Sequence, residues 1–575
     1  MEAPQHPHFE PHSAPDPTRT ADVLVDILVA AGVEVVFGLP GGTIAPVYDA
    51  LLDQPRIRTI ASRHESGAMF AAAAYARATG KLGVVLVTSG PGVINTMTGL
   101  ASAHCDGLPV LVLAGEVPRA LFGKHALQEG TAQHLDIVGM AGHITKLAAQ
   151  VNEPGAAAAT LRRAIATAMS GRRGPVLLTL PLDVLTAQIT APDINYEIRI
   201  ESRVSSAAIA RAADAIASAK RPVIFAGSGA RWGNGPARLA ELAHRLQVPV
   251  MTTPKAKGVF PEHHRLSLGV FGHGGHPSAT SYLEEGIDLI LAVGTGLSDP
   301  ATNGWSPLLK ASHHFIQIDA DALQIGRNYS VSQGLIGPAD VVLTQLLAAL
   351  PAGVRGSQRF GVRRFMDPSS SSDGPSGLIT PQRALWELQR AMPPTTIYAC
   401  DIGEHLLFAT HYLEVNDPQG FLIMTGLASM GTGVAGAVGI KLGLAKRPVV
   451  AVVGDGCFSM GLADLQTAVQ ERIPILVVVL NDRRYGMVEL GNNAVYGRTP
   501  SYRADEVDIG ELARGTGARA LTIRHAGDIM GAGLMASLAG GPLVIDVHID
   551  PKERMPKNKR FESLALGARR PRLVN

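Results

Sequence analysis

The chain has 575 residues, of which 46% are hydrophobic and 17% charged, with a net charge of +2. This length predicts about three or four domains, and the near-zero net charge argues against a nucleic-acid-binding surface. No uncharged apolar run approaches the ~18 residues of a membrane span, and the three cysteines form no CxxC or metal-binding spacing, so we expect a cytoplasmic protein without membrane or nucleic-acid partners.

The first 190 residues predict a tail followed by an α/β domain. Residues 1–19 lack the basic and apolar segments of a signal peptide, and we expect them to be disordered. The pattern over 20–190 then begins with a helix, a strand over 33–37 and a glycine turn that includes Gly42. Such a turn lets a backbone approach a ligand closely.

Glu65 follows a second predicted strand, over 57–61, and opens a helix of small apolar residues. An acidic residue in that place is ordinarily a helix cap or a partner of the helix dipole. A third strand, over 84–87, leads to a glycine turn and helix start with Pro91 and Asn95, which turn chemistry alone would explain.

The middle of the chain predicts a second doubly wound α/β domain, over 205–350. Its signals are a helix over 207–218 and strands over 222–226, 289–293 and 315–319. The turn Gly-Ser-Gly after the first of these strands lacks the full dinucleotide-binding pattern. Residues 355–378, rich in serine and glycine, read as a linker.

A third domain is predicted over 379–550. It begins with a helix over 381–392 and a strand over 396–400, after which Gly403, Glu404 and His405 open another helix. Backbone N–H groups at a helix start attract anions, although a lone histidine there is more often structural. A methionine such as Met430, near a glycine-rich turn, is ordinarily core packing.

Two acidic residues follow neighbouring strands of this third domain. Asp455 comes after the strand over 448–453, and Asp482 after the strand over 475–480. Open α/β sheets bind ligands at the carboxyl ends of their strands, and Mg²⁺ prefers carboxylate and phosphate oxygens. The sequence therefore predicts a Mg²⁺-diphosphate site, with simple turn residues as the alternative. Residues 551–575 form a basic C-terminal tail, either solvated or a closing lid.

These motifs, in this order, resemble acetohydroxyacid (acetolactate) synthase large subunits and related carboligases that depend on thiamine diphosphate (ThDP). The segments RHESGAMFAAAAYARATG and VVGDGCFSMG carry the likeness, which extends over about residues 20–551. The resemblance implies three doubly wound parallel α/β domains: pyrimidine-binding, central and diphosphate-binding. It also implies a homodimer or homotetramer in which Glu65 of one subunit meets the cofactor held by another.

The resemblance assigns roles to individual residues. Glu65 falls on the glutamate that hydrogen-bonds to the cofactor's aminopyrimidine, Gln128 on a glutamine that polarises a donor carbonyl, and Gly42 beside the reacting carbonyl. Asp455, Asp482 and the Arg484 carbonyl fall on the Mg²⁺ ligands. The remaining matches to cofactor contacts are Pro91, Asn95, Gly403, Glu404, His405, Ala428, Met430, Gly454, Gly456, Cys457, Met460, Tyr485, Gly486, Met487 and Val488.

Several positions depart from the family pattern. Asp482 stands where the family usually has asparagine, Glu404 where it has glutamine, and Gly491 where it has a tryptophan that shapes acceptor choice. We therefore expect a different acceptor pocket. In the central domain an arginine-containing flavin stretch is replaced by GTGLSDPATNGW, which leaves two alternatives open: bound FAD, or a structural domain without cofactor.

The resulting hypothesis is a ThDP- and Mg²⁺-dependent carboligase. It would decarboxylate a 2-oxo acid, with pyruvate as the expected donor, and transfer the acyl unit to a second carbonyl. One alternative is a simple 2-oxo acid decarboxylase. The other is a catalytically silent paralogue that binds ThDP.

Overall fold

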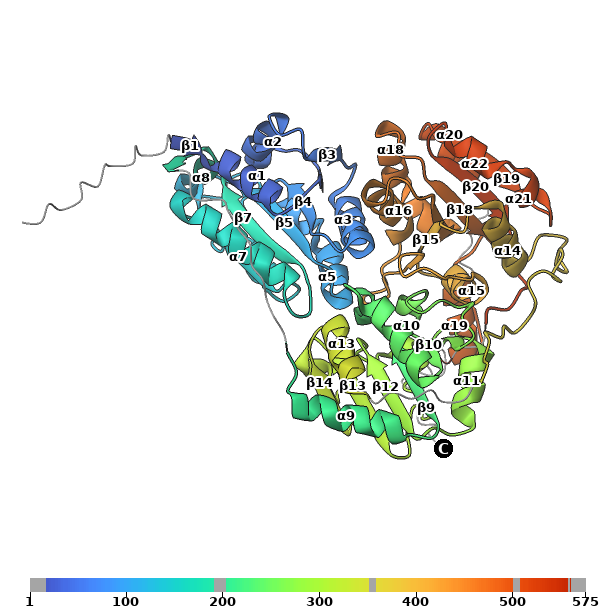
Figure 1. The fold of residues 1–575 in the computed structure, drawn as a ribbon. Helices are drawn as coiled ribbons and strands as arrows, with labels where there is room; N and C mark the ends of the chain where they lie inside the picture. Colours follow the sequence, from blue (N-terminus) through green and yellow to red (C-terminus); the bar gives the residue numbers. More distant parts are fainter. Residues whose placement is uncertain (1–16, 191–202, 351–357, 500–506, 557–558, 560–575) are drawn as a thin grey trace, which may run out of the picture.

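The chain folds into three α/β lobes in the computed structural model, which describes residues 17–190, 203–350, 358–499, 507–556 and 559 (Figure 1). Each lobe is built on a six-stranded sheet whose strands are all parallel, so the predicted fold class is confirmed. No helix in the described part of the chain is long and apolar enough to cross a bilayer. Most of the predicted N-terminal and C-terminal tails lies outside the described residues.

The first domain carries the sheet order β3-β2-β4-β5-β7-β6. Its strands are β2 (Val35–Gly38), β3 (Arg58–Ala61), β4 (Gly83–Val87), β5 (Val110–Glu116), β6 (Leu147–Gln150) and β7 (Val176–Pro181). Its helices are α1 (Thr20–Ala30), α2 (Ala45–Leu52), α3 (Glu65–Thr79), α4 (Pro91–Ile94), α5 (Met97–Asp106), α6 (Ile137–Gly142), α7 (Ala157–Met169) and α8 (Leu182–Thr186).

Strand β4 shows why the inner strands of this sheet are apolar. Val85 and Val87 point into one hydrophobic core, whereas Val84 and Leu86 point into a second core on the other face. Successive side chains alternate between faces, so a strand covered by helices on both sides needs an unbroken apolar run. Pro17–Arg19, which we expected in the disordered tail, instead forms strand β1 and pairs antiparallel with β8 (Gln188–Thr190).

The central domain has the sheet order β11-β10-β9-β12-β13-β14. In chain order this is 3-2-1-4-5-6, the order of dinucleotide-binding domains. Its strands are β9 (Pro222–Ala226), β10 (Val250–Thr252), β11 (Ser267–Val270), β12 (Leu289–Val293), β13 (His314–Asp319) and β14 (Gln333–Ile336). Its helices are α9 (Ser206–Ser218), α10 (Gly235–Leu246), α11 (Pro277–Glu284), α12 (Asp299–Thr302) and α13 (Ala339–Ala349).

The third domain has the sheet order β16-β15-β17-β18-β20-β19. Its strands are β15 (Ile397–Cys400), β16 (Phe421–Leu422), β17 (Val449–Gly454), β18 (Leu476–Asn481), β19 (Arg519–Ile523) and β20 (Leu543–His548). Its helices are α14 (Pro381–Ala391), α15 (Glu404–Tyr412), α16 (Thr432–Gly443), α17 (Asp455–Met460), α18 (Leu462–Gln470), α19 (Gly486–Tyr496), α20 (Ile509–Gly515), α21 (Asp528–Gly531) and α22 (Leu534–Leu538).

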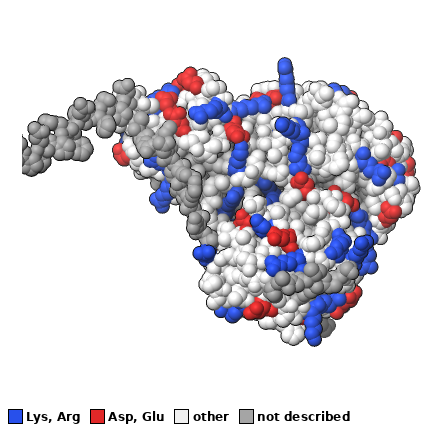
Figure 2. Space-filling view, viewed as in Figure 1, with Lys and Arg blue, Asp and Glu red and all other residues white. Residues whose placement is uncertain are grey.

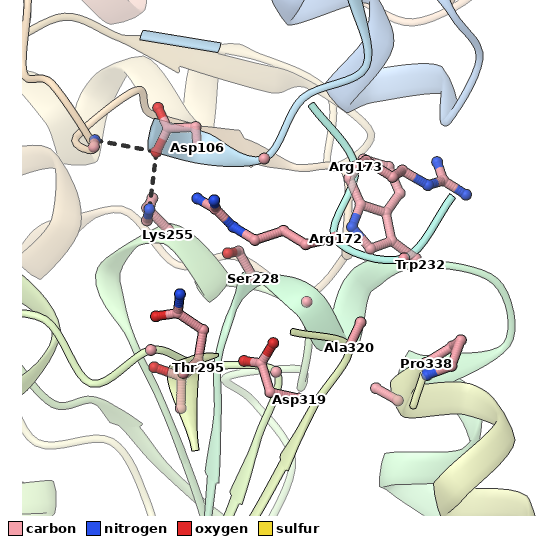
Figure 3. Close-up of a pocket in the computed structure, with 18 of the residues that line it drawn as sticks. Asp106, Arg172, Arg173, Ser228, Trp232, Lys255, Thr295, Asp319, Ala320 and Pro338 are labelled. Atoms are coloured by element: carbon pink, nitrogen blue, oxygen red, sulfur yellow. Dashed lines mark hydrogen bonds and ion pairs between the residues drawn. The ribbon is translucent and has the colours of Figure 1, made fainter. Parts of the chain in front are cut away.

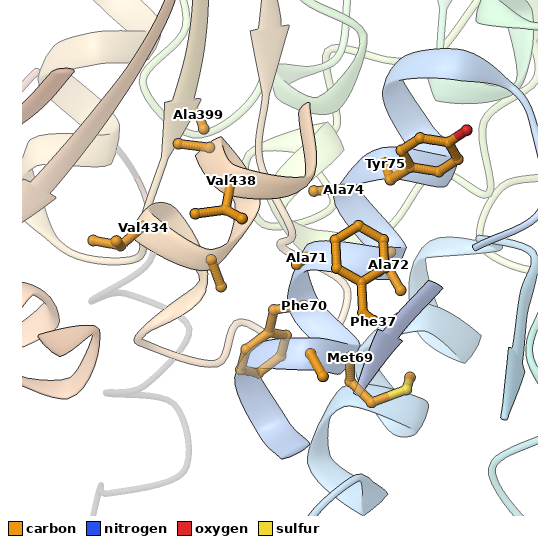
Figure 4. Close-up of a cluster of buried hydrophobic side chains, with 14 of the residues drawn as sticks. Phe37, Met69, Phe70, Ala71, Ala72, Ala74, Tyr75, Ala399, Val434 and Val438 are labelled. Atoms are coloured by element: carbon orange, nitrogen blue, oxygen red, sulfur yellow. The ribbon is translucent and has the colours of Figure 1, made fainter. Parts of the chain in front are cut away.

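Helices α3 and α16 join the first and third domains through closely packed small residues (Figure 4). The side chains of Ala71 and Ala74 face α16, and a β-carbon built at Gly439 would overlap the carbonyl oxygen of Ala71. Val434 and Val438 extend the same core from the α16 side. Glycine and alanine thus let the two backbones approach more closely than larger side chains would allow.

The predicted linker packs against the third domain rather than running free. Its residues 355–357 lie outside the described residues. Beyond them, the ring of Phe365 stacks on the ring of His411, with centroids 5.0 Å apart, and the Phe365 N–H donates a 3.0 Å hydrogen bond to His411 Nε2. Arg364 Nε donates to the His411 carbonyl at 3.1 Å.

On the face shown in Figure 2, acidic and basic side chains are interspersed.

Candidate active site

A cavity of about 240 Å³ opens at the carboxyl ends of β15, β17 and β18. Strands β15 and β17 are neighbours but not consecutive, so the chain leaves them in opposite directions, and a crevice forms between the loops that follow. The predicted site residues that line the cavity are Gly403, Glu404, His405, Ala428, Met430, Gly454, Asp455, Gly456, Cys457, Asp482, Arg484, Tyr485, Gly486, Met487 and Val488.

Asp455 presents an unsatisfied carboxylate oxygen to this cavity. The residue is only 7% exposed; its Oδ1 accepts a 2.8 Å hydrogen bond from the Gly456 N–H, while its buried Oδ2 has no partner among the described residues. Burial, followed by the charge of Asp482, raises the pKa of Asp455 to about 7. A buried carboxylate oxygen of this kind is available to coordinate a metal ion.

Asp482 and Glu404 converge on the same point of the wall. A β-carbon at Gly486 would overlap Oε2 of Glu404 and lie 3.0 Å from Oδ2 of Asp482. Arg484 compensates only Asp482 closely, through a 2.9 Å contact from Nε to Oδ2. Burial raises the pKa of Asp482, and burial with the Asp482 charge raises that of Glu404 to about 7.

His405 forms the floor between two glycine turns. Its ring lies close to where β-carbons at Gly403 and Gly454 would be, 2.6 and 3.0 Å away, so neither position accommodates a side chain without a shift. The ring is buried, its Nε2 has no partner in the described part of the chain, and burial lowers the pKa of His405 to about 4. A neutral histidine therefore faces the cavity.

Asp401, which sequence reasoning did not assign to the site, fixes the glycine turn before α16. Its Oδ1 accepts from the N–H groups of Ile402 and Gly431, at 2.7 and 3.1 Å, and its Oδ2 accepts from the Gly433 N–H at 2.7 Å. This carboxylate thereby holds Met430 at the cavity wall. Its signal in the sequence was its place at the end of a strand beside the switch point.

The cavity suits a metal-bound diphosphate. Helices α15 and α19 both begin at its wall, with Glu404 and Gly486 as their first residues. Their free backbone N–H groups attract phosphate oxygens, the glycines leave room for them, and the Asp455 and Asp482 carboxylates suit Mg²⁺. No cluster of three or more His, Cys, Asp or Glu side chains that could hold an ion occurs in the described residues.

The remaining predicted residues lie outside the cavity. Met460 ends α17 beside Gly431 and is 54% exposed. The others gather at the carboxyl rim of the first sheet, where β2 and β4 form the equivalent switch point: they are Gly42, Glu65, Pro91, Asn95 and Gln128.

Glu65 lies within a hydrogen-bonded group at this first rim. Its Oε2 accepts a 3.0 Å hydrogen bond from Asn95 Nδ2, and the carboxylate is buried at the start of α3. Gln128, with φ of +64°, lies against Gly90, where a β-carbon would sit 3.0 Å from the Gln128 backbone. The structure thus brings the predicted first-domain residues to one rim, but not to the cavity of the same chain.

The loop that carries Gln128 is organised by a buried acid that the sequence did not reveal. Glu129 is fully buried and accepts from the N–H of Gly123 at 2.6 Å, the N–H of Ala126 at 3.2 Å and the hydroxyl of Thr131 at 2.6 Å. These donors lower the pKa of Glu129. The loop therefore closes around one ionised carboxylate.

Other wall residues were also missed. Pro381, Ile402, Phe408, Leu480, Ile549, Asp550 and Glu553 complete the lining. Leu480 could have been inferred from its place at a strand end, whereas Glu553 belongs to the segment that we expected to be a separate tail. Its neighbour Pro551 accepts a 2.6 Å hydrogen bond from Arg484, so the start of that segment forms part of the wall.

A second and larger cavity, of about 1530 Å³, lies among the three domains (Figure 3). It opens at the switch point between β9 and β12, where the backbones after the two strands meet at Gly229 and Gly294. Asp319 and Thr295 face it from the central domain and Arg172 from the first. Burial raises the pKa of Asp319 to about 6.

Comparisons with known proteins agree with this architecture. Residues 18–140, 209–346 and 401–547 match the family descriptions "Thiamine pyrophosphate enzyme, N-terminal TPP binding domain", "central domain" and "C-terminal TPP binding domain". The "Probable acetolactate synthase large subunit" of Methanocaldococcus jannaschii is 34% identical over 94% of this chain and 93% of its own length. The "Acetolactate synthase isozyme 3 large subunit" of Escherichia coli is 33% identical over 88% and 90%.

The structural comparison supports the fold alone. The solved structure of the "Rhodococcus jostii RHA1 thiamine diphosphate-dependent 4-hydroxybenzoylformate decarboxylase" has a TM-score of 0.83 at 22% identity, covering 93% of this chain and 99% of that chain. The resemblance inferred from the motifs is confirmed by the family matches. The chain therefore belongs to the thiamine pyrophosphate enzyme family, as an enzyme related to acetolactate synthase large subunits.

Proposed function

We propose that this protein is a ThDP- and Mg²⁺-dependent carboligase that decarboxylates a 2-oxo acid, with pyruvate as donor, and joins the acyl unit to a second carbonyl. The observation that carries the proposal is the unsatisfied, buried Asp455 Oδ2 in a cavity that two helix N-termini border. The relatives named acetolactate synthase support carboligation over other reactions of this family. Three free cysteines, all among the described residues, support a reducing, cytoplasmic setting.

Each residue group has a distinct task in this proposal. Asp455, Asp482 and the Arg484 carbonyl hold Mg²⁺, and the first N–H groups of α15 and α19 hold the diphosphate. Bound ThDP supplies the electron sink that lets a 2-oxo acid lose CO₂. Met430 keeps the wall apolar, and the neutral His405 faces the cavity without adding charge.

Glu65 acts as the acid–base group in the proposed mechanism. Its carboxylate is buried, so it is shielded from water, and Asn95 orients it through the 3.0 Å hydrogen bond. Gln128 orients the carbonyl of the donor, and Gly42 leaves space beside it. Replacement of Glu65 by glutamine removes the transferable proton, and we expect turnover to fall by at least ~100-fold.

The acceptor is proposed to differ from that of typical relatives. Gly491 lies buried in α19, the helix that starts at the cavity. A glycine there, in place of a tryptophan, leaves room for a bulkier or differently shaped second carbonyl compound.

The products of one reaction test the proposal. Purified protein is incubated with ThDP, Mg²⁺ and pyruvate while CO₂ release is followed and the carbon products are identified by mass. Acetolactate supports the carboligase, and acetaldehyde without a coupled product supports the simple decarboxylase instead. CO₂ release from neither pyruvate nor a panel of other 2-oxo acids would mean a silent site.

We further propose that the active protein is at least a homodimer. The location of Glu65 outside the cavity of its own chain supports this, because a second chain can bring its Glu65 to the cavity. Glu65→Gln and Asp455→Asn should each inactivate the protein. Random mixing of the two variants should then restore about a quarter of the wild-type activity, since one intact site forms per mixed dimer. No recovery on mixing would argue against shared sites.

For the central domain, the large cavity supports the FAD alternative over a purely structural domain. Its position at a switch point of order 3-2-1-4-5-6 is where dinucleotides bind. Arg172 offers a cationic group to phosphates and Asp319 an acceptor for ribose hydroxyls (Figure 3). Flavin absorbance in the purified protein tests this alternative, and a colourless protein that binds no added FAD would contradict it.

A further inference from the structure

The charge balance of the smaller cavity is unusual for a site that receives an anion. Among the described residues that line it, five are acidic and Arg484 is the single arginine or lysine. Two of the acids are engaged elsewhere: Asp550 accepts from the N–H groups of Ser376 and Lys552, and Glu553 accepts from Gln382. The remaining three form an acidic wall.

The acidic wall consists of Glu404, Asp455 and Asp482. Glu404 and Asp482 converge at Gly486, and Asp455 contributes the buried Oδ2 that lacks a partner. Arg484 does not neutralise the group, because its guanidinium is shared among Asp482 at 2.9 Å, the Pro551 carbonyl at 2.6 Å and Glu489 at 3.8 Å. The wall therefore carries excess negative charge whenever its carboxyls are ionised.

This charge affects the two expected ligands in opposite ways. A diphosphate that enters first meets like charges in a half-buried, low-dielectric space, which weakens its binding. A divalent cation that enters first gains from each carboxylate and reverses the sign of the wall. Glu404 and Asp482 cause this difference, because neutral amides at these two positions would leave Asp455 as the sole acid of the three.

We propose that the acidic wall binds a divalent cation on its own, before the diphosphate, and that Glu404 and Asp482 enforce this metal-first order. The proposal rests on the proposed function, because it concerns the same metal and diphosphate site. Since no three ligands close around an ion in the described residues, the cation retains water until phosphate oxygens replace it.

Metal binding without ThDP is the direct test. The full-length protein is freed of metal by dialysis, and Mn²⁺ binding is measured by titration calorimetry and by the loss of the free Mn²⁺ signal in electron paramagnetic resonance. We expect one saturable site per chain. Glu404→Gln and Asp482→Asn should each weaken Mn²⁺ binding by about 10- to 100-fold, whereas Glu241→Gln, in an exposed pair with Arg238, should bind as wild type does.

Removal of the two acids should change the affinity for ThDP in the opposite sense to the affinity for Mn²⁺. Without metal, the Glu404→Gln/Asp482→Asn protein should bind ThDP more tightly than wild type, since repulsion has been removed. A general loss of folding cannot produce opposite changes for two ligands, so the pair of titrations excludes that explanation.

The outcomes separate this inference from the proposed function. If Mn²⁺ and ThDP bind together but Mn²⁺ alone does not, or if the Glu404→Gln and Asp482→Asn variants bind Mn²⁺ as tightly as wild type, the metal-first order is wrong and the proposed function stands. If ThDP does not bind even with metal present, the proposed function itself fails.

Discussion

The packing of α3 on α16 gives a sharp prediction about two glycines on one helix. A β-carbon at Gly439 would lie 2.7 Å from the carbonyl carbon of Ala71 and closer still to its oxygen, whereas one at Gly436 would lie 3.6 Å from the β-carbon of Ala74. Both substitutions to alanine gain about 1 kcal/mol of helix propensity. Only the first forces two backbones apart, and overpacking of this kind costs about 1–3 kcal/mol.

We expect the upper end of that cost, because the obstacle is a main-chain carbonyl. After the gain in helix propensity is subtracted, Gly439→Ala should destabilise the protein by a net ~2 kcal/mol. The melting temperature should then fall by roughly 4–8 °C for a domain of this size. Gly436→Ala should leave it unchanged or raise it slightly. Calorimetry on the two variants decides the matter, and equal melting temperatures would refute the claim that the helix spacing is set by these contacts.

Three other predictions concern buried acids. Burial raises the pKa of Asp464 to about 7, so between about pH 4 and 7 the folded protein binds more protons than the unfolded chain. The free energy of unfolding therefore falls as pH rises through that window. Asp464→Asn should remove this dependence in melting experiments, a difference of up to ~4 kcal/mol in the free energy of unfolding at the high-pH end. Lys257→Met should destabilise by about 3–5 kcal/mol in denaturant titrations, because Glu262, 2.6 Å away, is left charged and buried, and adding Glu262→Gln should recover part of that loss. Glu129→Ala should speed amide exchange at Gly123 while sheet amides stay protected, and unchanged exchange there would contradict its role as the loop organiser.

Much of the fold could be predicted from apolar runs and turn residues. The strands expected over 222–226 and 289–293 agree residue for residue with β9 and β12, because both are buried on two faces and bounded by polar or glycine residues. The meeting of Asp455 and Asp482 at one rim also followed from the sequence, since parallel neighbours end at the same edge. Their role as metal ligands stays a prediction.

What the sequence could not supply depends on contacts between distant elements. Nothing in the local pattern shows that Glu553 returns to the cavity wall, or that Asp464 packs against α3 at Gly67. The close pairing of Arg484 with Asp482 depends on side-chain geometry at a strand end, and the burial of Glu129 depends on a loop with three non-glycine residues at positive φ. Periodicity carries no information about such arrangements.

The first and third sheets wind in the same order, and the helices that join them, α3 and α16, are the same element in each: both run from the second strand to the third. Equivalent helices of two like domains therefore pack on each other within one chain. One chain thus contains two like halves, separated in sequence by the central domain. The junction before this helix differs between the two domains: in the first it presents the carboxylate of Glu65, and in the third it presents Met430 and a glycine turn held by Asp401.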